Sequence, residues 1–428
     1  MIKQKYFNRM ARIGLCFSAL LALSSLAFSQ VDTSFNRINL SYTDYLSMVV
    51  RGNLEYAVEK YSINIADAKI EAAKVFQNPS LAFDWSRDEE NYSLSAEISK
   101  TFELGQKRKA RINLAKSERS VANAMLLDYL RNLQADATLD YLAALKQNYL
   151  FRVMLNSYQT MKELSDGDSV RFSLGSINAI DATQSKIEAG VLRNDLFQIE
   201  VERNNSFINL STKTGTYISD TLFFPVGKFE MTRRHFAIDE LLTNALNSRA
   251  DLLAAKSNLT YNQNSLILTR RERMMDIDLK TGTKNSYLNT GSSSPNATEI
   301  FAGIAIPLKF SNFNKGEIKI AKFQIEQGEL LYKKVEMKIQ TEVLQAYNQY
   351  TSLCKQVGSY NQGLLDQAKM VLNGKMYSYS RGETSLLEVL NAQRTYNDLQ
   401  TAYYETLYKC NEALVELERA AGIWDIEL

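Results

Sequence analysis

The sequence offers few side chains that could carry out catalysis. His235 is the only histidine, so a histidine-based triad and a metal site with several histidines are both excluded. The chain has no CxxC pair, no P-loop and no GxGxxG sequence. Its 12 methionines are scattered, with Met274 and Met275 as the only adjacent pair, so a methionine relay for soft metal ions has no support. We therefore expect neither an enzyme nor a cofactor.

Two cysteines could react with each other. Cys354 and Cys410 lie 28 residues before and 28 residues after Gly382. An antiparallel helix pair that reverses at Gly382 would bring both thiols to a similar height, where a disulfide could form in an oxidising compartment. Two thiols packed in the core without a bond are the more ordinary alternative, and the spacing does not decide between them.

The N-terminus has the pattern of an export signal. Four basic residues precede an apolar run over 13–26 that is too short to span a bilayer, and a small-x-small cleavage site ends at Ser29. We expect residues 1–29 to be removed on export. Without them the 50 basic residues fall to 46 against 48 acidic ones, a net charge near −2. Such a balance provides no electrostatic attraction to nucleic acid.

The second half of the chain repeats the first. Gly175 recurs as Gly382 and Gly215 as Gly422, both 207 residues later, and Ala115 recurs as Ala321 at nearly the same offset. A constant offset over a hundred residues indicates a duplicated unit. We expect a first repeat over 30–220, a linker at the equator over 221–236, and a second repeat over 237–428.

Each repeat contains a long helical pattern. No proline occurs between Pro79 and Pro225 or after Pro307, and apolar residues recur at steps of three and four. We expect helices over about 106–172, 176–214, 316–379 and 384–421. At ~1.5 Å per residue, the longest would be rods of roughly 100 Å, which span a compartment rather than fill a globule.

Each repeat also contains two short segments with strand patterning. Leu81, Phe83 and Trp85 alternate with small or polar residues, and we expect strands over about 79–87, 92–102, 277–287 and 299–310. Strands of about ten residues with one wet face suit a transmembrane β-barrel. Four strands leave two open edges and small barrels need about eight, so several chains must share one wall. The count permits two, three or four chains.

Two basic clusters border these segments. If the strands lie in a membrane, both clusters lie where the barrel wall meets the periplasm, and contact with anionic lipid headgroups follows. Solvated helix ends explain the clusters equally well. The residues concerned are Lys107, Arg108, Lys109, Arg111, Arg270, Arg271 and Arg273.

Several motifs, in their order and spacing, resemble the TolC-type outer-membrane efflux proteins over essentially all of the mature sequence. They are Asn78-Pro79-Ser80-Leu81, Arg249-Ala250-Asp251-Leu252, Gly303 to Leu308, Gly382 to Glu388, and Ala420-Ala421-Gly422. The resemblance implies a mainly α fold with a small transmembrane β part, in which a homotrimer forms a 12-stranded barrel continued by a long α-helical tunnel. It implies a passive exit duct in a Gram-negative outer membrane. Such a duct receives substrate from an inner-membrane pump, of RND or ABC type, through a periplasmic adaptor.

The resemblance also implies roles for residues at the periplasmic tip, where Gly175 and Gly382 would mark the turns of two helical hairpins. The family narrows its pore with an acidic residue six positions after the second glycine, which is Glu388 here. Asn391 replaces a second acidic residue three positions later, so one ring of carboxylates is expected. An ordinary glutamate at a helix start is the alternative interpretation of Glu388.

Asp181 and Tyr379 match a family pair that links neighbouring hairpins across the closed gate. Thr384 stands where the family has an arginine that strengthens this latch, so a weaker or differently built gate is expected. Asp181 could instead be a simple helix-start residue.

For the whole chain, an exported coiled-coil scaffold of the periplasm is the alternative function, although it leaves the four strands unexplained. The transported substrate, whether drug, metal or protein, stays open.

Overall fold

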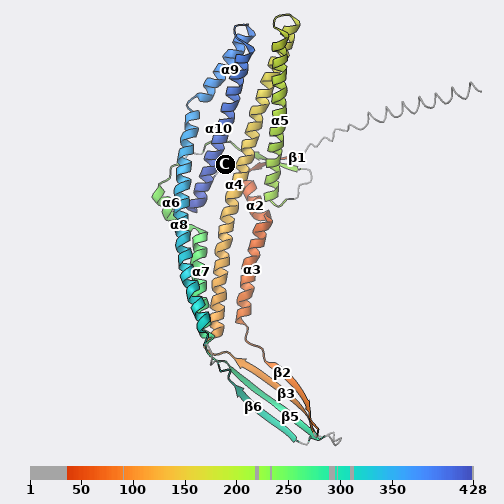
Figure 1. Cartoon of the computed structure of the whole chain (residues 1–428), viewed down its shortest axis with the longest axis vertical. Coiled ribbons are helices and arrows are strands. Elements are labelled where there is room, and N and C mark those ends of the chain that lie inside the picture. The colour runs from red at the N-terminus through yellow and green to blue at the C-terminus, as the bar shows by residue number, and fades with distance from the viewer. Residues whose placement is uncertain are drawn as a thin grey trace, which may run out of the picture.

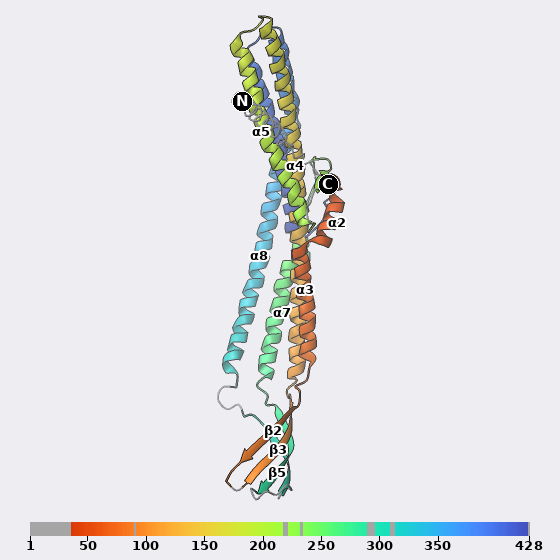
Figure 2. The same cartoon turned by 90° about the vertical axis from the view of Figure 1, so that its right-hand side faces the viewer.

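The computed structural model describes residues 36–89, 91–216, 221–231, 234–288, 295, 297–308 and 313–426. The signal peptide expected over 1–29 and most of the loop between the third and fourth strands lie outside the described residues. The described chain is a long rod, with a β-sheet at one end and two helical reversals at the other (Figure 1, Figure 2). The expected fold class, mainly α with a small β part, is confirmed.

The first repeat contains one exceptionally long helix. Its elements are β1 (Asn36–Ser41), α2 (Tyr42–Gly52), α3 (Leu54–Lys74), β2 (Ser80–Arg87), β3 (Asn91–Phe102), α4 (Lys107–Ser173) and α5 (Ala179–Lys213). Helix α4 runs for 67 residues without a break, so it is roughly 100 Å long. It ends just before Gly175, whose φ of +72° belongs to the left-handed region that favours glycine.

The second repeat follows the same plan with one difference. Its elements are β4 (Thr221–Val226), α6 (Ile238–Ser248), α7 (Ala250–Arg271), β5 (Ile277–Leu288), β6 (Ala297–Ala305), α8 (Lys315–Tyr360), α9 (Leu364–Ser380) and α10 (Leu386–Ala421). The helix expected over 316–379 is interrupted between α8 and α9, where Gly363 has a φ of +95°. Absence of proline was therefore not sufficient for an unbroken helix.

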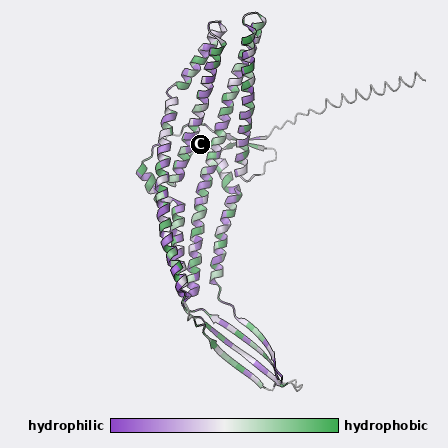
Figure 3. Ribbon diagram, in the orientation of Figure 1, coloured by the Kyte–Doolittle hydropathy of each residue, from purple (hydrophilic) through white to green (hydrophobic). Residues whose placement is uncertain are grey.

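The four strands form one antiparallel sheet in the order β2-β3-β5-β6. Strand β6 ends at Ala305 rather than near residue 310, because Pro307 has no amide hydrogen for a sheet ladder. The register puts one apolar set on a single face: Leu81, Phe83, Trp85, Leu94, Ile98, Leu279, Ile300 and Ile304. Serines and charged residues dominate the other face, which also contains Phe301, and hydrophilic and hydrophobic residues are interspersed along the sheet (Figure 3).

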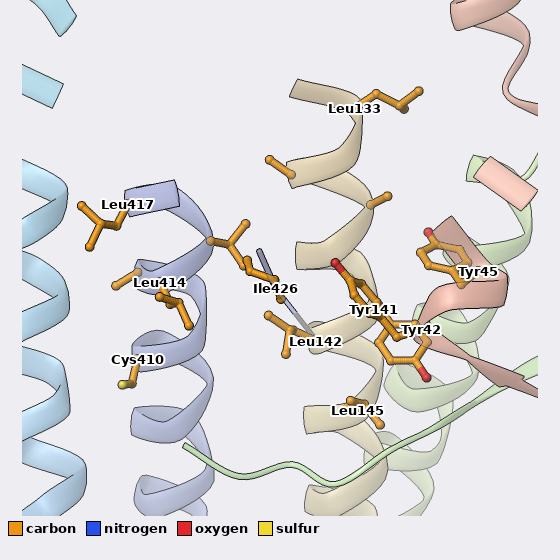
Figure 4. Close-up of a cluster of buried hydrophobic side chains, with 14 of the residues drawn as sticks. Tyr42, Tyr45, Leu133, Tyr141, Leu142, Leu145, Cys410, Leu414, Leu417 and Ile426 are labelled. Atoms are coloured by element: carbon orange, nitrogen blue, oxygen red, sulfur yellow. The ribbon is translucent and has the colours of Figure 1, made fainter. Parts of the chain in front are cut away.

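The main core lies at mid-height, where α4 and α10 meet the chain's short elements. Strands β1 and β4 pair in parallel there, from Asn36↔Thr221 to Ser41↔Val226. The fully buried Tyr141 of α4 contacts both strands, because its hydroxyl lies within hydrogen-bond distance of the carbonyl oxygens of Leu40 and Val226, at 2.9 and 2.8 Å, and accepts a bond of 3.1 Å from the Val226 amide. The rings of Tyr42 and Tyr45 pack on the Tyr141 ring, each with its centroid 5.6 Å from the Tyr141 centroid (Figure 4).

A glycine in each repeat makes close helix contacts possible near this core. A Cβ on Gly215 would lie 2.1 Å from the carbonyl oxygen of Gly52, and a Cβ on Gly422 would lie 2.7 Å from the Ser248 hydroxyl. The buried Arg249 next to Gly422 binds Asp251 at 2.6 Å and Glu342 at 2.7 Å. These contacts explain why the motifs at 249–252 and 420–422 lie together.

Among the described helices, none has the length and apolar content needed to cross a membrane.

Candidate functional site

The end of the rod opposite the sheet contains both reversals, at 174–178 and 381–385 (Figure 1). Gly175 and Gly382 have φ values of +72° and +78°, and a Cβ on either would meet nothing within 4 Å. The turns therefore need glycine for backbone conformation, not for space. A second apolar cluster joins the two hairpins below the turns, with Met161, Ala189, Leu192, Tyr379, Leu386, Val389 and Leu390 as its buried members.

A polar contact inside this cluster joins α4 to α9. The hydroxyl of Tyr379 donates a hydrogen bond of 3.0 Å to Asp168 Oδ1, and the Asp168 side chain is only 1% exposed. The Arg171 guanidinium lies 3.6 Å from the same oxygen and 4.9 Å from the centre of the Tyr379 ring. Burial and the Asp168 charge raise the pKa of Tyr379, so the phenol stays a hydrogen-bond donor.

Within the single chain, the two residues of the expected latch do not bond to each other. Within one chain, Tyr379 bonds to Asp168, while the backbone amide of Asp181 bonds to the Asn178 side chain at the start of α5. Asp181 is still close enough for its charge to raise the pKa of Tyr379. Sequence reasoning missed Asp168 and Arg171, although an acid and a base three residues apart just before Gly175 were a usable signal.

Glu388 lies in the first turn of α10, and its carboxylate forms an ion pair with Lys375 of α9. Their side chains are 50% and 43% exposed. The hydrogen bond from Lys375 lowers the pKa of Glu388 from its ordinary value of 4.5. Asn391 is exposed one turn further along α10. The carboxylate expected to narrow a pore therefore already has a cationic neighbour, which the sequence reasoning did not single out.

Two further polar contacts hold the hairpins together. Arg394 of α10 donates three hydrogen bonds of 2.9 to 3.1 Å to the Glu188 carboxylate of α5. Deeper in, the Ser157 hydroxyl of α4 donates to Asn397 Oδ1 of α10 at 2.5 Å. Both pairs cross from the first repeat to the second, so separating the hairpins requires breaking them along with the Tyr379 bond.

At the other end, the basic residues mark the junction of helices and sheet, and several are engaged in protein contacts. Lys107, with a side chain only 8% exposed, pairs with Asp276 at 2.7 Å, and Arg111 pairs with Glu103 at 2.9 Å. Arg108 donates to the Lys74 carbonyl oxygen at 2.6 Å. These three stabilise the junction, while four others are exposed: Lys109, Arg270, Arg271 and Arg273.

Sequence comparison identifies relatives of this chain. Residues 241–423 match the family model described as outer membrane efflux protein. Over 379 residues the chain is 22% identical to the cobalt-zinc-cadmium resistance protein CzcC of Cupriavidus metallidurans, with 88% of each chain covered.

Solved structures share the fold over most of its length. The CmeC outer membrane channel of Campylobacter jejuni superposes with a TM-score of 0.74 at 13% identity, covering 89% of this chain and 85% of that one. The open state of the MtrE outer membrane channel of Neisseria gonorrhoeae gives a TM-score of 0.69 at 15% identity, with 89% and 88% covered. The resemblance predicted from the motifs is confirmed, because residues 241–423 match the outer membrane efflux protein model and solved outer-membrane channels share the fold over most of the chain.

Proposed function

We propose that three copies of this chain form an outer-membrane exit duct, which passes substrate from an inner-membrane pump and a periplasmic adaptor to the exterior. The observation that carries the proposal is a four-stranded sheet with one apolar and one polar face at the end of a helical rod roughly 100 Å long. A wall segment of this kind suits lipid on one side and water on the other.

The two faces of the sheet support this assignment. Phe83, Trp85 and Ile300 on the apolar face are 69%, 66% and 81% exposed in the single chain. On the opposite face, Lys280 pairs with Glu97 at 3.1 Å, as suits a water-filled interior. The stacked rings of Tyr92 and Tyr287, with centroids 4.7 Å apart, lie on the apolar face near the loop end, where barrels carry an aromatic girdle.

The outer strands of the sheet support sharing of the wall. β2 and β6 each pair on one side within the described chain, so each presents a further edge whose backbone groups lipid cannot satisfy. Neighbouring copies would satisfy both edges, and three copies would supply twelve strands.

The helices also present surfaces that suit neighbouring copies. Exposed apolar side chains also occur beyond the sheet, along α5 and α8, and such exposure is unfavourable for an isolated rod in water. They include Ile187 at 61%, Phe197 at 51%, Val201 at 58%, Leu330 at 68% and Met337 at 69% exposed. Packing of three copies would bury these residues and enclose a tunnel.

The tip would close this tunnel at rest. Contacts between Tyr379 and Asp168, and between Arg394 and Glu188, hold the two hairpins of one chain together. Asp181, beside Tyr379, is positioned to contribute charge to the same latch or to that of a neighbour. Three Glu388 residues would surround the axis, and Lys375 would partly offset the negative charge of each carboxylate. An adaptor would open the gate by separating the hairpins.

The duct would leave cargo selection to the pump. Among the described residues, no three His, Cys, Asp or Glu side chains gather where they could hold a metal ion.

At the junction of helices and sheet, the exposed Lys109, Arg270, Arg271 and Arg273 would face lipid headgroups.

The proposal is tested by expressing the full chain with its own N-terminus in a Gram-negative host. We expect it in the detergent-extracted outer membrane as an oligomer that dissociates only on heating, and we expect conductance steps in planar bilayers. Recovery of the chain entirely in the soluble periplasmic fraction would favour the scaffold alternative.

A further inference from the structure

Helices α8 and α10 bring two cysteines into contact. Cys354 Sγ lies 3.1 Å from Cys410 Sγ, although 56 residues separate them in the chain. Cys410 is completely buried in the main core, and Figure 4 shows its side chain directed from α10 toward α8. The antiparallel arrangement of the two helices sets this height match, because the reversal near Gly382 lies midway between the cysteines.

The geometry is close to that of a disulfide. An S–S bond is about 2.05 Å long, so the sulfurs need to approach by roughly 1 Å. Small rotations about the Cα–Cβ bonds provide such a movement without displacing the helices. Two sulfurs several ångströms further apart would need movement of the backbone before they could bond, whereas the Sγ atoms of this pair are already 3.1 Å apart.

We propose that Cys354 and Cys410 form a disulfide when the chain folds in the periplasm, an inference that rests on the export and location proposed above. The oxidant is a thiol–disulfide oxidoreductase of that compartment. Each cysteine loses its proton, one S–S bond forms between them, and the two electrons reduce the disulfide of the oxidant to a dithiol.

The bond has to form before the core closes. In the folded chain the hydrogen bond with Cys354, together with burial, raises the pKa of Cys410, so little thiolate is present to react. An external oxidant also has no access to a side chain that is completely buried. The same burial protects the finished disulfide from reductants as long as the chain stays folded.

The position of the pair gives the disulfide a mechanical consequence. Cys354 lies six residues before the end of α8 at Tyr360, and the break around Gly363 follows directly. A bond from Cys354 to α10 would fix the foot of the α9–α10 hairpin just below this break. Bending of α9 would then be confined to residues above the cross-link, while the uninterrupted α4 supports the first hairpin.

The test counts thiols in the full chain purified from outer membrane. The protein is unfolded in denaturant and treated with a maleimide polymer that adds a fixed mass to each free thiol, with and without prior reduction. We expect no addition before reduction and two additions after it. A reductant applied to the native protein and removed before unfolding should expose fewer than one tenth of the thiols.

Two controls make the result decisive. A chain lacking residues 1–29, kept in the reducing cytoplasm and treated identically, should add two polymers without reduction. The C410A variant, exported normally, should add one. Two additions to unreduced outer-membrane protein would overturn the disulfide while leaving the proposed function intact. Failure of the chain to reach the outer membrane would instead contradict the proposed function.

Discussion

The hydroxyl of Tyr379 in α9 donates a hydrogen bond to the buried carboxylate of Asp168 in α4, and this bond joins the two hairpins at the tip. Arg171 lies close to both partners, with its guanidinium 3.6 Å from the carboxylate. In the proposed latch, the cation therefore comes from the first hairpin, whereas Thr384 stands where the resemblance led us to expect an arginine. Opening of the proposed gate by an adaptor would require release of this group.

Replacing Tyr379 with phenylalanine should weaken the closed tip. The change removes the only described hydrogen bond to a side chain that is 1% exposed, at a cost of about 1–3 kcal/mol. We expect a higher resting conductance in planar bilayers. The matched control is Tyr377→Phe, because Tyr377 is 60% exposed on the same helix. Equal conductance in Y379F and wild type would show that this bond does not hold the gate closed.

Lys375 should attenuate the charge of Glu388. Lys375→Met leaves the carboxylate without its ion-pair partner, so block by multivalent cations should strengthen several-fold, whereas Glu388→Ala should weaken block and raise single-channel conductance. Lys369→Met is the matched control, since Lys369 is an exposed lysine on the same helix. If K375M and K369M respond alike to cations, the pair lies away from the conduction path.

The pH dependence of cation block should follow Glu388. Its pKa in the folded chain is lowered from 4.5, because Lys375 favours the charged form, so the contribution of the pair is complete above pH 4.5 and is lost as pH falls through the lowered pKa. Block should therefore persist between pH 7 and 4.5 and decline only below that. In K375M the decline should begin at higher pH. A wild-type decline already complete at pH 5 would contradict this assignment.

The two faces of the sheet should respond oppositely to a positive charge. Phe83→Arg places a guanidinium on the face assigned to lipid, at a cost of about 2–4 kcal/mol near mid-membrane, and should reduce the amount of assembled protein. Ala82→Arg is the control, because Ala82 is on the other face, opposite Glu97. Outer-membrane yields of oligomer on unheated gels measure the difference. Similar yields for both variants would contradict the assignment of faces.

The alternation of Leu81, Phe83 and Trp85 was enough to predict which side chains share a face, because a strand has no other periodicity. The interruption before α9 was not predictable in the same way. Gly363 could have continued a helix at modest cost, but it adopts a left-handed conformation with a φ of +95° just before α9.

The contacts of the tip were only partly accessible from the sequence. Glu388 and Tyr379 stand at fixed distances from Gly382, so motif spacing found them. Lys375 and Asp168 lie 13 and 211 residues from their partners, and only the three-dimensional fold brings them into contact. The role of Lys107 was hidden for the same reason, since its partner Asp276 lies 169 residues away.

Native mass spectrometry of the full-length protein, extracted from outer membrane in mild detergent, tests most directly whether copies of the chain share one wall. The account predicts a single species with the mass of three mature chains. A species with the mass of one chain, under conditions that preserve a known outer-membrane trimer, would contradict it.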